Sequence, residues 1–210
     1  MSRKIPAYLI NLNISKDRLR AFRKRADAVG LTFQRVEGVD GRRVAPSSNG
    51  VRIGGSGARG CALSHRKVAR IFLRTSSRFC IVMEDDAMPV RPLPDTVRKV
   101  RQLKRKARVG RGGMDIMYLQ HMKAQGRRVV GGYGTYGYIL TRPGARKLLQ
   151  LTRGCTSPID LVLLSHFAGR GGRRGSIRAY AAWERGVAKP FIAHRPVNGS
   201  VIKKVTRSTA

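Results

Sequence analysis

Short apolar runs and amphipathic stretches alternate along the first part of this 210-residue chain. Residues 7–12 (AYLINL) and 79–83 (FCIVM) are largely apolar, which is typical of strands buried on both faces of a parallel sheet. Residues 16–29 repeat apolar side chains at helical spacing, and residues 32–36 follow as a second predicted strand. This strand–helix–strand order predicts an α/β fold in which helices cover a parallel sheet.

The alternation continues beyond this unit. A helix is predicted from Ala58, with a buried stripe that includes His65, and residues 96–108 are predicted to form a basic helix. The remaining predicted elements are strands at 114–119 and 136–140, a helix capped by Thr141, and a helix starting at Ser157 with Leu161, Leu164 and Phe167 on one face. We expect one domain over residues 1–210, with its core between about 5 and 202 and flexible loops at about 42–57 and 169–178.

Three acidic residues, Glu84, Asp85 and Asp86, directly follow the apolar run 79–83. Ligands of open α/β sheets bind outside the carboxyl ends of the strands, which is where these acids are expected to lie. The chain has eleven acidic residues and a net charge of +33, so such a cluster is unusual in it. Carboxylate oxygens suit Mg²⁺ or Mn²⁺, and we predict a metal site here. A solvated acidic turn or a helix cap is the alternative.

Other polar positions have both structural and functional interpretations. His65 neighbours Ser64 on one helix, where adjacent side chains do not face each other, so a buried structural role is expected for His65. Asp160 suits the first turn of its helix through the helix dipole, and Asp115 suits a strand start. Glycines at 131, 132 and 134 would let the backbone approach a ligand closely, although a hairpin turn explains them equally well.

Composition narrows the class of protein further. The three cysteines form no CxxC pair, which favours reduced core residues of a cytoplasmic protein. No run of about eighteen apolar residues is present, and the N-terminus lacks the pattern of a signal peptide. The strong positive charge indicates an anionic partner such as nucleic acid, an anionic membrane or a phosphorylated acceptor, without choosing among them.

The motifs, taken in order, resemble glycosyltransferase family 25, which includes lipooligosaccharide galactosyltransferases and collagen hydroxylysine galactosyltransferases. The match extends from about Ala7 to Ile202 and rests on the segments YLINLNISKDR, RVEGVDG, GCALSHRKV, FCIVMEDDA, GTYGYILTRPGARKLL and SPIDLVL. The resemblance implies a GT-A type fold with a mostly parallel central sheet flanked by helices. It also implies an inverting transfer, usually of galactose from UDP-galactose, to a glycan, lipooligosaccharide or protein acceptor.

The resemblance also implies roles for individual residues. Asp86 would bind Mn²⁺ or Mg²⁺ directly, with Glu84 and His194 as further candidate metal ligands; the family usually has Gln at the position of His194. Glu84 or Asp85 would contact the ribose or the sugar. The remaining candidate donor-binding residues are Asn11, Arg18, Gly134 and Tyr136. An inverting transfer needs a carboxylate base for the acceptor hydroxyl, and Asp160 is preferred over Asp115.

Two other functions are considered. The pattern disfavours a nucleic-acid-binding protein, because the aromatic residues are not interleaved with basic ones as stacking platforms require. A degenerate transferase fold that binds anionic polymers is opposed by the retention of all three acids. The basic segments 96–108 and 169–178 are expected to bind the inner face of an anionic membrane, or else to reflect a general arginine-rich bias.

Overall fold

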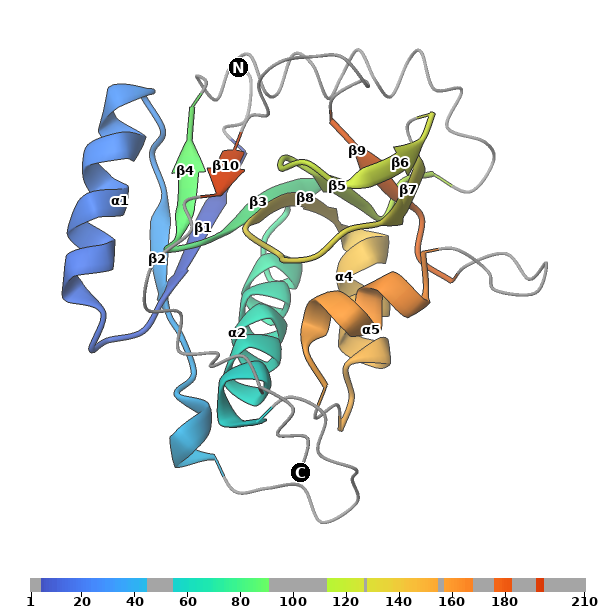
Figure 1. The fold of residues 1–210 in the computed structure, drawn as a ribbon, viewed down its shortest axis with the longest axis horizontal. Helices are drawn as coiled ribbons and strands as arrows, with labels where there is room; N and C mark the ends of the chain where they lie inside the picture. The colour runs from blue at the N-terminus through green and yellow to red at the C-terminus, as the bar shows by residue number, and fades with distance from the viewer. Residues whose placement is uncertain are drawn as a thin grey trace, which may run out of the picture.

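An eight-stranded sheet forms the centre of the computed structural model, in the order β2-β1-β3-β8-β5-β9-β7-β6 (Figure 1). The structure describes residues 5–44, 55–90, 113–126, 128–154, 157–167, 176–182 and 192–194. The strands of this sheet are β1 (Ala7–Asn11), β2 (Gln34–Glu37), β3 (Phe79–Glu84), β5 (Ile116–Tyr118), β6 (Lys123–Gln125), β7 (Arg128–Gly131), β8 (Gly137–Thr141) and β9 (Ala179–Ala181). A separate antiparallel pair joins β4 (Ala87–Pro89) to β10 (Ile192–His194).

Most strands of the central sheet run in one direction. Strand β1 is parallel to β2 and β3, and β5 is parallel to β9. Strand β8 lies antiparallel between β3 and β5, and β7 lies antiparallel between β9 and β6. Strands β7 and β8 therefore oppose the other six. The predicted α/β fold, with a mostly parallel central sheet flanked by helices, is confirmed.

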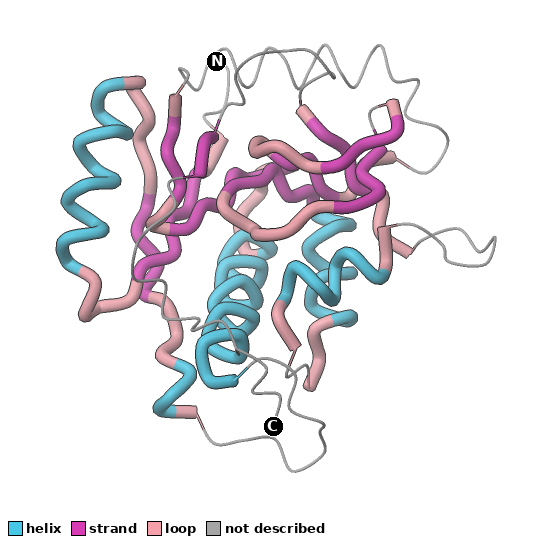
Figure 2. The backbone as a smooth tube through the Cα atoms, viewed as in Figure 1, coloured by secondary structure: helices cyan, strands magenta, loops and turns pink. Residues whose placement is uncertain are grey.

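Three helices gather on one side of the sheet (Figures 1 and 2). These are α2 (Gly55–Leu73), α4 (Arg142–Leu151) and α5 (Ile159–Ser165). Helix α1 (Lys16–Ala28) lies beside β2, the first strand in the order of the sheet. A short 3-10 helix, η1 (Gly41–Arg43), precedes α2. In the described part of the chain, no helix combines the length and the apolar character needed to cross a membrane.

The core is built from the apolar runs that the sequence predicts to be strands. All five residues of β1 are buried, as are Cys80 to Met83 in β3. Helix α1 contributes Phe22 and Ala26, and the predicted stripe on α2 is buried. Burial of such side chains contributes roughly 1.5–3 kcal/mol each, so these runs fix β1 and β3 at the centre of the fold. The predicted Thr141 cap is also present, because its hydroxyl accepts a hydrogen bond from Gly144 N.

Some local predictions are wrong. Helix α2 begins at Gly55 and takes in the end of the loop predicted at 42–57. Of the stripe predicted here, Phe167 is buried and Leu164 packs against the core, but Leu161 is 39% exposed, and the buried residues of α5 are Ile159 and Leu163. Leu161 lies two positions from both Ile159 and Leu163, about 200° around the helix, so it is directed away from the buried face. The predicted helix at 96–108, residues 45–54 and residues 169–175 lie outside the described residues.

Candidate functional site

The acidic cluster lies where β1 and β3 both end. Glu84 is the last residue of β3, and Asp85 and Asp86 occupy the turn that leads into β4. Because β1 is parallel to β3, with Ile10 level with Glu84, the end of β1 at Asn11 lies beside the acids. This is the carboxyl edge of the parallel strands, where α/β folds bind their ligands. We call this group, Glu84, Asp85 and Asp86, the acidic edge.

Asn11 supports the acidic edge from β1. Its side-chain Nδ2 donates to Asp85 Oδ2 at 2.7 Å and to the Ser15 carbonyl at 3.0 Å. Its Oδ1 accepts from Arg35 Nε at 2.9 Å, and the residue is 1% exposed. The amide is thus fully engaged within the protein. Asn11, predicted as a donor contact, is better described as a residue that positions Asp85.

Arg18 brings a positive charge to the acidic edge. Arg18 lies in the first turns of α1. Its guanidinium Nη2 is 2.7 Å from Asp85 Oδ1 and 3.4 Å from Asp86 Oδ2. The Arg18 side chain is partly exposed, so it reaches the acids from the solvent side. A guanidinium so placed is also suited to bind a phosphate group of a ligand.

The acidic edge carries more negative charge than its described partners balance. Burial raises the pKa of Asp86 to about 7, the charges of Glu84 and Asp85 add to this effect, and Arg18 opposes it. Burial also raises the pKa of Asp85, against the effects of Arg18 and Asn11. Within the described residues, Asp86 Oδ1 is buried and accepts no hydrogen bond. A carboxylate with an available oxygen, beside a second one, is a donor set that fits Mg²⁺ or Mn²⁺.

Glu84 is held in a separate network. Its Oε1 accepts a 2.5 Å hydrogen bond from the Thr135 hydroxyl and lies 3.3 Å from His65 Nε2. His65 is buried, as predicted, and its Nδ1 is 2.7 Å from the Tyr138 hydroxyl. Burial pushes the pKa of Glu84 upward, but the hydrogen bonds from His65 and Thr135, with the charges of His65 and Arg18, outweigh it. The pKa of Glu84 therefore lies below its ordinary value.

The segment between β7 and β8 reaches the acidic edge through its backbone. Tyr136 O accepts from Glu84 N at 3.0 Å. Gly134 has φ +85°, and a Cβ there would lie 2.5 Å from the Tyr136 ring, so glycine is required. Buried Gln120 fixes this segment, because its Nε2 donates to Gly134 O at 2.9 Å and its Oε1 accepts from Gly137 N at 2.9 Å.

Asp160 joins the same region from the first turn of α5. Its Oδ2 accepts from Gly134 N at 3.0 Å, and its Oδ1 accepts from Leu161 N at 3.0 Å. The pKa of Tyr136 is raised by burial and then by Asp86, Glu84 and Asp160, so all three carboxylates act on this one phenol. The structure therefore brings Gly134, Tyr136 and Asp160 together with the acidic edge, although they are far apart in the sequence.

Asp115, the second predicted candidate base, lies at the opposite edge of the sheet. It directly precedes β5, and its carbonyl accepts a hydrogen bond from Thr141 N. Thr141 is level with Phe79, the first residue of β3, so Asp115 lies near the start of β3 and not near its end. Its side chain is fully buried, and its Oδ2 accepts from Lys147 Nζ at 2.6 Å and Arg178 N at 2.9 Å. The assignment of Asp115 as a base is corrected: it is a structural ion-pair residue. Because strand direction decides this, the sequence alone did not separate Asp115 from the site.

His194 is placed by its backbone only. Strand β10 is antiparallel to β4, and His194 is level with Ala87, the residue that follows Asp86. The backbone therefore comes close to the acidic edge. The His194 side chain lies outside the described structure, so its assignment as a metal ligand stays a prediction.

Three residues of this region were missed in the sequence. Gln120 and Thr135 are neutral side chains without a motif, and only the fold shows their partners. Cys61 could have been found, since it lies four positions before His65 on a predicted helix, a spacing that puts both on one face.

Parallel α/β sheets bind ligands at the carboxyl ends of their strands, and an arginine placed there suits a phosphate group. The comparisons with known proteins make this class more specific. Residues 4–107 match the sequence model of a family described as glycosyltransferase family 25 (LPS biosynthesis protein). The Anopheles gambiae protein named "Glycosyltransferase 25 family member" is 26% identical over 170 residues, covering 68% of this chain and 28% of that protein. By this N-terminal half, the chain belongs to glycosyltransferase family 25.

Two further facts describe the extent of these similarities. The chain spans 28% of the length of the curated relative from Anopheles gambiae. A solved structure, the "crystal structure of a glycosyltransferase involved in the glycosylation of the major capsid of PBCV-1", aligns with a TM-score of 0.43 and 9% identity. That alignment covers 84% of this chain and 80% of the other.

Proposed function

We propose that this chain is an inverting glycosyltransferase that uses a nucleotide-sugar donor. The expected donor is UDP-galactose, and the acceptor is a hydroxyl group of a glycan, a lipid-linked saccharide or a protein. Family membership supports the reaction class. The observation that carries the proposal is the meeting of the acidic edge, Arg18 and Asp160 at the carboxyl ends of β1 and β3.

The donor side of the site is formed by Arg18 and the acidic edge. Asp86, with Asp85 beside it, would hold Mn²⁺ or Mg²⁺, since Asp86 Oδ1 is free of described hydrogen bonds. When bound, such a cation supplies Lewis-acid neutralisation of a diphosphate. Arg18 already lies against Asp85 and Asp86, and its guanidinium would pair with the phosphate oxygens of the donor. Gly134 and Tyr136 would line the sugar side.

The acceptor side is assigned to Asp160. In an inverting transfer the acceptor oxygen attacks the anomeric carbon from the face opposite the nucleotide. The new carbon–oxygen bond forms as the bond to the diphosphate breaks, and the nucleoside diphosphate leaves with the electron pair. Asp160 would take the acceptor proton, because each of its oxygens accepts one backbone hydrogen bond and retains another lone pair.

A purely structural role for Asp160 is the competing assignment. Its hydrogen bond from Gly134 N ties α5 to the segment before β8, and this would matter for the fold without any catalysis. The two roles differ in their effect on donor binding: loss of the base alone leaves donor affinity unchanged, whereas loss of a structural contact lowers it.

The proposal is tested by UDP release from a panel of UDP-sugars, with and without Mn²⁺. Slow donor hydrolysis in the absence of an acceptor is sufficient, so the acceptor need not be known. We expect release to require Mn²⁺ or Mg²⁺ and to be fastest with UDP-galactose. A folded protein that neither binds nor hydrolyses any of these donors would contradict the proposal.

A further part of the proposal concerns the excess charge. The basic segment 96–108 would hold the protein on an anionic membrane surface, with about 1 kcal/mol per Lys or Arg. In the second segment, 169–178, one charge is already paired, since Arg178 Nε lies 3.5 Å from Asp115 Oδ2 and the Arg178 side chain is only partly exposed. Co-sedimentation with anionic vesicles should weaken as salt rises and when residues 96–108 are neutralised. Equal binding to neutral vesicles, or tighter binding to RNA, would contradict membrane attachment.

A further inference from the structure

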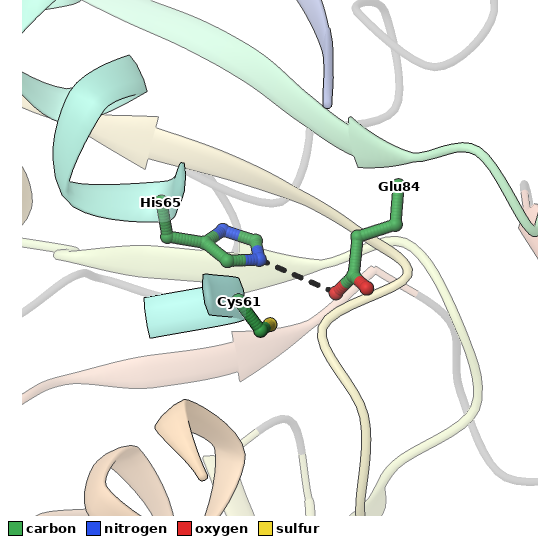
Figure 3. Close-up of side chains that lie close together, drawn as sticks. All are labelled: Cys61, His65 and Glu84. Atoms are coloured by element: carbon green, nitrogen blue, oxygen red, sulfur yellow. Dashed lines mark hydrogen bonds and ion pairs between the residues drawn. The ribbon is translucent and has the colours of Figure 1, made fainter. Parts of the chain in front are cut away.

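Three side chains with different ligand chemistry meet at Glu84, the first residue of the acidic edge (Figure 3). Cys61 and His65 come from α2, and Glu84 comes from the end of β3. The Cys61 Sγ, a His65 ring nitrogen and a Glu84 carboxylate oxygen all lie within 4.8 Å of one another. We propose that Cys61, His65 and Glu84 form a binding site for Zn²⁺, separate from the cation assigned to Asp85 and Asp86.

The distance between the histidine and glutamate ligand atoms suits a tetrahedral ion. Zinc binds nitrogen and oxygen ligands at about 2.0 Å and sulfur at about 2.3 Å. Two ligands at about 2.0 Å, separated by the tetrahedral angle, are roughly 3.3 Å apart. His65 Nε2 and Glu84 Oε1 are 3.3 Å apart. Figure 3 shows the Cys61 side chain beside this pair, and its sulfur lies within 4.8 Å of the ligand atoms of His65 and Glu84.

The positions of the ligands follow from the secondary structure. Cys61 and His65 are four residues apart on a helix, and this spacing places both side chains on one face. Glu84 ends a strand that is buried at the centre of the sheet. All three ligands therefore lie on regular elements, which hold a coordination geometry more rigidly than loops do.

Two of the ligands are oriented by hydrogen bonds of their own. The Tyr138 hydroxyl lies 2.7 Å from His65 Nδ1, which leaves Nε2 directed at Glu84. The Thr135 hydroxyl donates to Glu84 Oε1. Histidine and carboxylate ligands of zinc usually have such partners, and these fix the ring orientation and raise ligand affinity.

The charge around Cys61 also favours a dication. The pKa of its thiol is raised by burial first, and then by Glu84, Asp160 and Asp86. Negative surroundings that oppose a thiolate attract a divalent cation, whose charge in turn stabilises the thiolate. Sulfur and imidazole ligands select Zn²⁺ over Mg²⁺ and Mn²⁺. Three protein ligands leave a fourth position for water.

Zinc at this position would join α2 to the end of β3 and to Thr135. It would fix the base of the acidic edge, whether or not the chain transfers a sugar. The alternative is that the site holds no ion. In that state Tyr138 donates to His65 Nδ1, His65 Nε2 donates to Glu84, and Cys61 remains a thiol. The two states differ in zinc content and in the state of the sulfur.

The first experiment measures zinc on the full chain after chelator treatment and titration with zinc alone. We expect stoichiometric binding by the wild type and loss of at least about a hundredfold in affinity for Cys61→Ser. Thr135→Val, which removes a hydroxyl that is bonded to Glu84 and Cys61 and leaves all three ligands in place, should weaken binding by about 10–100-fold. Cys80→Ala is the matched control, because Cys80 is a buried thiol in β3 that belongs to no such group. It should bind zinc like the wild type.

The second experiment replaces zinc with Co²⁺, which reports a thiolate ligand through a sulfur-to-metal charge-transfer band in the near ultraviolet. The band should be present in the wild type and in Asp86→Asn, and absent in Cys61→Ser. Retention in Asp86→Asn separates this site from the transferase cation, so that either can fail without the other. Absence of stoichiometric zinc in the wild type, or a cobalt band unchanged in Cys61→Ser, would overturn the proposal.

Discussion

Buried carboxylates stand at both edges of the central sheet, with very different surroundings. At the edge where β5 begins, Asp115 is fully buried and its Oδ2 is bonded by Lys147 Nζ and Arg178 N, with Arg178 Nε at 3.5 Å. At the opposite edge, three carboxylates lie together. Arg18 is the one Lys or Arg side chain within ion-pair distance of them in the described parts of the chain.

The difference separates a structural acid from candidate functional ones. Asp115 has two cationic partners for one charge, which is how proteins usually retain a buried carboxylate. Asp86 shares Arg18 with Asp85, and burial raises its pKa to about 7. A site that leaves buried negative charge unbalanced is costly in the absence of a ligand, and such perturbed groups concentrate at functional sites. The comparison therefore supports the proposal that the acidic edge binds a ligand and that Asp115 serves stability.

The largest effect is expected from Asp86→Asn. This change removes the carboxylate without removing core packing, and transfer should fall by about a thousandfold or more, because a Lewis-acid cation contributes several kcal/mol. Chelation by EDTA should have the same effect on the wild type. UDP release measured for both proteins checks this. Full activity of the wild type in EDTA would contradict a role for a metal ion in the transfer.

The second largest effect concerns Asp160. With Asp160→Asn, transfer should fall by about 10²–10⁴-fold while the affinity for the UDP-sugar stays nearly unchanged, since the base faces the acceptor. Donor affinity is measured by calorimetric titration alongside the rate. Gly134→Ala is the comparison variant, because it disturbs the segment bonded to Asp160 and leaves the carboxylate in place. Parallel loss of donor binding in Asp160→Asn would make Asp160 structural.

A third effect follows from the pKa of Asp86. The folded protein keeps the proton up to about pH 7, whereas the unfolded chain loses it near its ordinary pKa of 3.8. Unfolding therefore releases a proton between these values, and stability should fall as the pH rises through this range, by up to about 4 kcal/mol. Denaturant unfolding in EDTA from about pH 5 to about pH 8 measures the upper part of this fall, about 3 kcal/mol. Asp86→Asn should flatten the dependence, and an equally steep fall in that variant would assign it to other groups.

The smallest effect is expected at the other edge. Asp115→Asn should lower the free energy of unfolding by about 2–3 kcal/mol, less than a fully buried pair would lose, because Lys147 and Arg178 are one-third exposed. The folded fraction should keep its transfer activity. Thermal and denaturant unfolding, with activity measured per folded molecule, checks both statements. Lost activity in a fully folded Asp115→Asn would break the contrast between the two edges.

Much of the fold could be predicted because the sequence signals for its strands and helices are local. The apolar run of β3, followed at once by Glu84, Asp85 and Asp86, predicts both a buried strand and an acidic edge at its end. Asp115 shows the limit, since an acid at the start of one strand and acids at the end of another look alike until strand directions are known. The link between Gly134 and Asp160 depends on how α5 packs. No local pattern encodes that packing.

The partners of Glu84 show the same limit at the level of side chains. Its position in the acidic motif suggests one common role for all three acids, yet its carboxylate is bonded to His65 and Thr135, away from Asp85. Glu84 in β3 and His65 in α2 lie in elements that only the fold brings together. The sequence could indicate that Cys61 and His65 share a face of α2, but not that Glu84 completes the group.

The central claim, that the acidic edge binds a divalent cation, is tested most directly by titrating Mn²⁺ into the protein and following free Mn²⁺ by electron paramagnetic resonance. The wild type should bind, and Asp86→Asn should not. Asp17→Asn removes an exposed acid from α1 and serves as the matched charge control, so it should bind like the wild type. Equal Mn²⁺ binding by the wild type and Asp86→Asn would contradict the account.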